Sequence, residues 1–187
     1  LAEKWEANPD MTEWTLFLRK GVPFHFGYGE FTARDVVHSH SLMLREEAAA
    51  TFVGMWRNVE EVKVINDYQV VFRMKKPSTT MDYAVSRAGD FRIVSKAQWD
   101  KEGLEGFDKR PAGTGSYRYV GRQQGISITF ERVDNHWHDK PAFKQLDSME
   151  ARVQGCVTCH GRNGQGSGNG AFPRIAGKPA GYLYNQL

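Results

Sequence analysis

Bulky apolar residues alternate with polar ones in several stretches of the first 132 residues, a pattern typical of half-buried β-strands. The alternating stretches are residues 14–19, residues 59–75, and the pair formed by residues 116–120 and 126–132. Asn66-Asp67, a dipeptide that favours a tight turn, divides the second stretch, and residues 121–125 divide the third. The pattern therefore predicts one strand followed by two β-hairpins.

Apolar spacing and capping residues predict short helices between these strands. The first helix is expected to begin at Thr32, because Thr32 to Asp35 resembles a capping box with Asp in place of Glu, and to run to about Ala50. Further helices are expected at residues 79–88 and at residues 96–102, the latter capped by Ser95 and closed by Gly103. Hairpins and short helices in one chain predict a mixed α+β fold.

Composition narrows the class of protein. The 187 residues are 40% hydrophobic and 12% aromatic, which suits one ordinary domain or one domain with a small second one. No apolar run approaches the roughly 20 residues that a membrane-spanning helix needs. The 25 basic and 22 acidic residues are interspersed and leave a net charge of +3, so the sequence predicts no nucleic-acid partner and no transmembrane segment.

Several aromatic and histidine side chains have structural explanations. Core or rim packing is expected for Trp5, Trp14, Phe24 and Trp137. The imidazoles of His38 and His40 are two residues apart on a predicted helix, so they are expected to point to different faces. His136 and His138 would share one side of a strand, and a structural role is favoured over a metal pair because the sequence fixes no acidic ligand beside them.

The most specific chemistry lies in Cys156-Val157-Thr158-Cys159-His160, which contains both cysteines of the chain. A C-x-x-C-H pentad is the attachment pattern of c-type haem. The two thiols bond the porphyrin and the adjacent imidazole binds iron, because positions three and four apart share one face of a helical turn. The pentad therefore predicts one covalent haem c as the cofactor.

A zinc half-site, a redox dithiol and a plain disulfide are the alternatives for this pentad. Zinc needs four ligands, and the nearest further histidines, His136 and His138, lie about twenty residues upstream. A thioredoxin-type dithiol expects a βαβ context, which the glycine-rich residues after His160 do not supply. Haem attachment is favoured over these alternatives.

Seven short segments in residues 1–147 carry a resemblance to a known family. They are residues 1–6, 14–25, 31–37, 68–77, 93–96, 113–118 and 135–138. In this order and spacing they resemble the extracytoplasmic solute-binding proteins of the dipeptide/oligopeptide/nickel ABC-importer family. The resemblance implies part of the first lobe of a periplasmic-binding-protein-type fold, a periplasmic or extracytoplasmic location, importer membrane subunits as partners, and a small peptide or metal as solute. It transfers no solute-binding residue, so those residues are unknown.

Residues 150–187 carry a second resemblance. The pentad is followed by Phe172-Pro173 and Ile175-Ala176-Gly177, and together they resemble the N-terminal part of a class I c-type cytochrome. The resemblance implies that Cys156 and Cys159 hold the haem covalently and that His160 is the axial iron ligand. It also implies that Pro173 lies against His160 and fixes its imidazole. Residues 148–187 would then form a truncated, mostly α segment with a redox partner protein.

These observations support three hypotheses for function. The main one is covalent c-type haem binding with single-electron transfer, carried on a solute-binding-protein-like scaffold. The alternative is the extracytoplasmic substrate-binding component of a peptide/nickel-type ABC importer. The second alternative is a non-functional chimera of two incomplete genes. None is an enzyme, because the sequence shows no activated nucleophile, phosphate loop or carboxylate pair that can be placed together.

Overall fold

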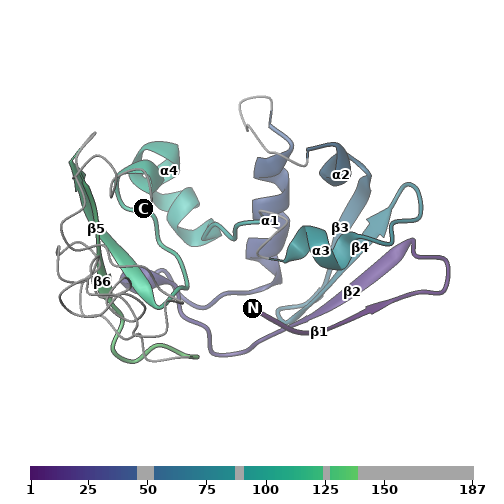
Figure 1. Cartoon of the computed structure of the whole chain (residues 1–187), viewed down its shortest axis with the longest axis horizontal. Coiled ribbons are helices and arrows are strands. Elements are labelled where there is room, and N and C mark those ends of the chain that lie inside the picture. Colours follow the sequence, from purple (N-terminus) through teal and green to yellow (C-terminus); the bar gives the residue numbers. More distant parts are fainter. Residues whose placement is uncertain (46–52, 87–90, 124–126, 139–187) are drawn as a thin grey trace, which may run out of the picture.

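The chain forms a four-stranded antiparallel sheet with helices on one face, and a separate two-stranded hairpin (Figure 1). The computed structural model describes residues 1–45, 53–86, 91–123 and 127–138. In chain order the elements are β1 (Ala2–Ala7), β2 (Glu13–Leu18), η1 (His25–Gly27), α1 (Ala33–Met43), α2 (Val53–Arg57), β3 (Val59–Asn66), β4 (Gln69–Met74), α3 (Met81–Val85), α4 (Lys96–Lys109), β5 (Tyr117–Gln123) and β6 (Ser127–Arg132). The predicted mixed α+β fold is confirmed for the described residues.

The main sheet has the strand order β1-β2-β4-β3, and every neighbouring pair is antiparallel. The strand predicted at residues 14–19 and the hairpin predicted at residues 59–75 are both present. The turn lies at Asp67-Tyr68, one residue later than predicted, because Asn66 ends β3 and pairs with Gln69. The sequence pattern does not predict β1. All six of its residues are exposed, so this edge strand has no buried positions to produce an alternating pattern, and backbone pairing with β2 defines it.

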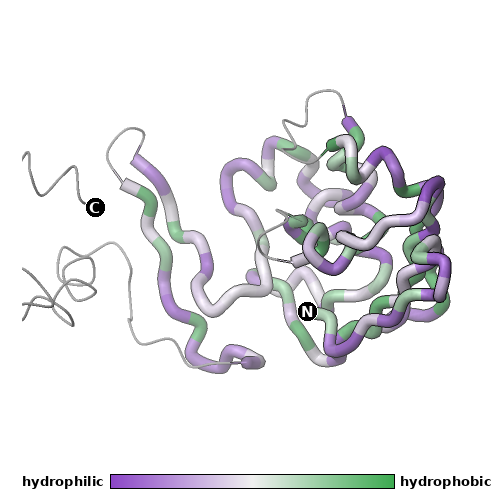
Figure 2. Tube along the Cα trace, turned by 45° about the vertical axis from the view of Figure 1, so that its right-hand side comes forward, coloured by the Kyte–Doolittle hydropathy of each residue, from purple (hydrophilic) through white to green (hydrophobic). Residues whose placement is uncertain are grey.

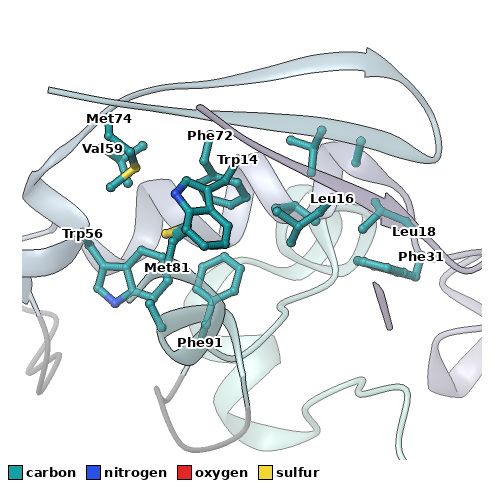
Figure 3. Close-up of a cluster of buried hydrophobic side chains, with 14 of the residues drawn as sticks. Trp14, Leu16, Leu18, Phe31, Trp56, Val59, Phe72, Met74, Met81 and Phe91 are labelled. Carbon is teal, nitrogen blue, oxygen red and sulfur yellow. The ribbon is translucent and has the colours of Figure 1, made fainter. Parts of the chain in front are cut away.

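The core lies between the sheet and the helices (Figure 3). Alternate residues of a strand point to one face, and here that face of β2 and β4 is apolar and buried. The sheet residues are Trp14, Leu16, Leu18, Val70, Phe72 and Met74. Trp56 of α2, Met81 of α3 and Phe91, which lies between α3 and α4, close over them. The Trp56 and Phe91 rings stack with centroids 4.6 Å apart. Burying each such side chain contributes about 1.5–3 kcal/mol.

The described helices differ from their predictions mainly at their ends. Helix α1 begins after Thr32 with the predicted capping box and ends at Met43, earlier than expected. Helix α4 begins after Ser95, whose side chain accepts from the Gln98 amide. Gly103 has φ 64° and ψ −165°, so the first helical stretch ends at this glycine as predicted, and a second stretch follows it across the kink as far as Lys109.

The second hairpin, β5 and β6, stands apart from the sheet in both views (Figures 1 and 2). It matches the prediction except that β5 continues through Gly121, Arg122 and Gln123, which were expected in the turn. Gly121 pairs with Thr129 beside a register shift. No residue of either strand is buried. In the part of the chain that the structure describes, none of the helices combines the length and apolar character needed to cross a membrane.

Candidate functional site

A pocket of about 180 Å³ lies where the hairpin joins the rest of the molecule. We call it the junction pocket. Its lining includes Phe24, His25, Phe26, Arg118, His136 and Trp137. These residues come from the loop before α1, from β5 and from the segment after β6, so the pocket is closed by parts of the chain that are far apart in sequence.

A tight loop presents the first wall of the pocket. The backbone closes on itself through two bonds, Phe24 N–H to the Gly29 carbonyl and Phe31 N–H to the Val22 carbonyl, each 2.8 Å long. Within it Phe26 has φ 61° and ψ 18°, a left-handed conformation that costs a non-glycine residue about 1–2 kcal/mol. The Arg110 guanidinium lies over the Phe26 ring, 4.7 Å from its centroid, and helps to hold this conformation.

His25 bonds this loop to the segment that leads into β5. Its backbone N–H donates to the Gly113 carbonyl at 2.9 Å, and its side-chain Nε2 lies 2.8 Å from the Gly115 carbonyl oxygen. A carbonyl can only accept, so Nε2 carries the proton. In the neutral imidazole Nδ1 is then an unprotonated acceptor.

Two more rings, those of Trp137 and His136, bond the same segment. Trp137 Nε1 donates to the Thr114 carbonyl at 2.8 Å, and His136 Nε2 lies 3.1 Å from the same oxygen. The His138 N–H donates to His136 Nδ1 at 3.3 Å, which is consistent with a proton on His136 Nε2. We call the bonds from these rings and from His25 to the carbonyls of residues 113–115 the carbonyl latch.

The electrostatics keep His25 neutral. Burial is the main cause that lowers the pKa of His25, and the electrostatic effects of the neighbouring Arg118 and His136 lower it further. The bond to the Gly115 carbonyl acts in the opposite direction but does not outweigh burial. The imidazole is therefore a neutral donor to the latch near pH 7.

Gln98 of α4 fixes the chain just before the latch. The side chain is fully buried, and its Nε2 donates to the Arg110 carbonyl at 2.9 Å. Its Oε1 accepts from the Ala112 N–H at 2.8 Å. The Gln98 side-chain amide thus bonds two backbone groups where the chain leaves the helix. These bonds help to place the following residues, 113–116, beside His25.

Arg118 supplies the charge of the pocket. Its Nε donates to Glu131 Oε1 at 2.5 Å across the hairpin, where the two residues are directly paired. Its terminal amines have no partner among the described residues, and its side chain is 44% exposed. A donor fork, a neutral acceptor on His25 and aromatic walls can together hold a small polar molecule.

The histidine and aromatic predictions have mixed outcomes. His38 and His40 do point different ways, His38 to Trp99 and His40 to Trp56. His136 and His138 do not lie on a strand, so that prediction is wrong. Packing is confirmed for Trp14 and Phe24, which are buried, and for Trp137, which is partly buried. Trp5 is 55% exposed, so its predicted packing is wrong.

The predicted haem residues Cys156, Cys159, His160 and Pro173 lie outside the described residues, and their individual roles stay predictions. Among the residues that the structure does describe, no group of three or more His, Cys, Asp or Glu side chains could hold a metal ion. The sequence did not single out His25 or Arg118 as site residues. The available signal was their position inside segments 14–25 and 113–118, which the structure brings together.

Comparison with protein families identifies the class. Residues 1–151 match the family described as "Bacterial extracellular solute-binding proteins, family 5 Middle". The match covers most of the 187 residues, and the chain belongs to this family of extracellular solute-binding proteins.

Individual relatives agree with the family match. The dipeptide-binding protein of Escherichia coli K12 is 31% identical over 170 residues, which covers 80% of this chain and 31% of the relative. Heme-binding protein A of Haemophilus influenzae is 27% identical over 170 residues, which covers 78% of this chain and 30% of the relative. The structure of MoaA from A. tumefaciens R10 in complex with mannopinic acid has a TM-score of 0.71 and 27% identity. The match covers 84% of this chain and 33% of MoaA. The chain thus spans about a third of the length of these relatives.

These findings correct the main functional prediction. Covalent haem c binding with single-electron transfer is wrong as the function, and one covalent haem c is wrong as the cofactor, because the family and its relatives are solute-binding proteins. The haem prediction depended on five residues, whereas the solute-binding resemblance is spread over residues 1–147. Five residues with a given spacing can occur by chance, but the longer pattern reflects many packed positions of one fold.

Proposed function

We propose that this chain serves as the solute-capturing component of an ABC importer on the extracytoplasmic side of the membrane. The observation that carries the proposal is the family match over residues 1–151, supported by the likeness of the fold to the MoaA structure. In this role the protein delivers solute to the membrane subunits of the importer and catalyses no reaction itself.

A short peptide is the solute class that the comparisons favour. The relative with 31% identity is named for dipeptides, while other relatives are named for haem and nickel, at 27% and 23% identity. The nickel resemblance therefore supports a metal solute less strongly than a peptide.

Thermal unfolding in the presence of candidate solutes tests this proposal. The protein is heated with panels of dipeptides, tripeptides and nickel chloride, and with free amino acids as matched controls. A solute at a hundred times its Kd stabilises the folded state by about 2.7 kcal/mol, so the Tm rises with the concentration of a true ligand. The proposal fails if no panel raises the Tm and the protein does not stimulate the ATPase of a reconstituted dipeptide-type importer.

We also propose that the chain divides near residue 147, into a partial solute-binding-protein lobe at residues 1–147 and a distinct segment at residues 148–187. The family match, which ends at residue 151, supports a boundary in this region. Truncation after Asp147 should leave the cooperative unfolding transition at the same temperature. A fall in Tm of several degrees would show that the two parts stabilise each other.

A further inference from the structure

We propose that the junction pocket binds a small carboxylate with an apolar body, such as an aromatic or branched-chain acid. The pocket has the volume of about six water molecules, which suits a compact ligand of this kind. The inference does not depend on importer function, because the walls of the pocket are built entirely from described residues of this chain.

The apolar part of the ligand is expected to lie against aromatic rings whose positions are fixed. Phe24 is only 4% exposed and packs edge-on against Phe31, with the ring centroids 6.4 Å apart. The Trp137 ring is held by its bond to the Thr114 carbonyl, and the Arg19 guanidinium lies 5.4 Å from its centroid. Rings held in this way give apolar contact without a further loss of side-chain freedom on binding.

The charged part of the ligand is assigned to Arg118. Its Nε is used by Glu131, while its two terminal amines have no partner among the described residues and can donate in parallel to two oxygens. A carboxylate fits this fork better than a neutral amide because both of its oxygens accept and its charge is opposite. The neighbouring Glu131 carboxylate weakens the attraction, so the site is expected to be of modest affinity.

His25 adds selectivity among acids of this size. Its Nδ1 is unprotonated and has no partner among the described residues, so it can accept from a hydroxyl or amine on the ligand. Gly113 leaves this edge of the ring open, since a Cβ there would lie 3.9 Å from Nδ1, within ordinary contact distance. A hydroxyl-bearing acid such as mandelate should therefore bind more tightly than benzoate.

The test follows the indole N–H resonance of Trp137 by NMR while sodium benzoate is added to the whole chain. The resonance is assigned by its absence in Trp137→Phe. Benzoate should shift it saturably, and neutral benzamide of the same shape should not. Arg118→Gln should weaken benzoate binding by about tenfold or more, the usual effect of losing a hydrogen bond to a charged group. Arg122→Gln, on the same hairpin but outside the pocket, should leave the affinity unchanged.

A gain of affinity keeps the test decisive even if Arg118→Gln does not fold. Glu131→Gln removes the carboxylate that competes for Arg118 and should tighten benzoate binding. The proposal is overturned if benzoate produces no saturable shift, if benzamide shifts the resonance equally, or if Glu131→Gln binds benzoate more weakly than the unchanged chain.

Discussion

At the scale of single residues, Trp14 is buried at an inward-facing position of β2, and Phe24 is buried in the loop before α1. Both are large apolar residues, for which burial is the usual outcome. The role of His25 could not be predicted in the same way. Its ring reaches the Gly115 carbonyl 90 positions away, and that distance closes only after the loop and the hairpin have taken their places.

Three histidines, His40 buried and His25 and His38 partly buried, predict acid sensitivity. Burial is the largest cause that lowers the pKa of His25, His38 and His40, and His40 has the clearest setting, 8% exposed with Nε2 3.3 Å from the Trp56 carbonyl. In the unfolded chain the pKa of each imidazole is about 6.5. As the pH falls from about 7.5 through that value, the unfolded state binds more protons, so the free energy of unfolding falls and then levels off below the folded pKa.

His40→Gln tests this expectation, because glutamine keeps a group that can bond to the Trp56 carbonyl but does not titrate. The loss of Tm between about pH 7.5 and pH 5.5 should be smaller in His40→Gln than in the unchanged chain. Ser41→Ala, exposed on the same helix, serves as the matched control. An identical pH dependence in all three proteins would show that His40 does not contribute.

At the scale of elements, local sequence rules work where the determining residues are neighbours. The capping box at Thr32 to Asp35 was predictable because four consecutive residues contain it. The second helical stretch of α4, beyond Gly103, was not predictable, since a glycine after a helical run usually marks its end, as it does here. Strand β1 was missed for a related reason, because its pairing partner determines it and its own burial pattern does not.

Asp35 joins two helices and should contribute more to the free energy of unfolding than an ordinary capping residue. One oxygen accepts from Thr32 N–H at 2.8 Å, and the other accepts from Lys96 N–H at 2.9 Å at the start of α4. Asp35→Ala should lower the free energy of unfolding by about 2–4 kcal/mol, since it removes a cap and leaves a second amide without its acceptor.

Urea unfolding with an unchanged m value would measure this loss. Asp82→Ala is the matched control, because Asp82 also lies in the first turn of a helix but is exposed. Among the described residues its side chain bonds the adjacent Tyr83 amide, at 2.8 Å, and no second helix. Equal effects of the two substitutions would rule out a special role for the bond to α4.

At the scale of the whole molecule, the ordered segments in residues 1–147 correctly predicted the family, although no single segment is specific. The haem hypothesis was specific but local, and it did not describe the fold that most of the chain forms. What the sequence could not supply is the relation between the hairpin and the sheet. That relation depends on bonds between backbone carbonyls and side chains. Every residue has a backbone carbonyl, so the sequence does not indicate which carbonyls accept these bonds.

The carbonyl latch should therefore set how the hairpin is held. Two of its ring donors, His25 Nε2 and Trp137 Nε1, each contribute about 1 kcal/mol as net hydrogen bonds. Replacing both with phenylalanine keeps aromatic packing but removes the donors, which should weaken the junction by about 2 kcal/mol and let the hairpin move relative to the sheet.

Spin labels can measure this movement, with one on Asp10→Cys beside the sheet and one on Gln123→Cys at the end of β5, in a background of Cys156→Ser and Cys159→Ser. The distance distribution should broaden in the double phenylalanine variant. It should stay narrow in Arg122→Gln, which removes the exposed ion pair with Asp108 at 3.0 Å, because such pairs contribute little in water. If Arg122→Gln broadens the distribution and the double variant does not, surface charge holds the hairpin in place and the ring donors to residues 113–115 do not.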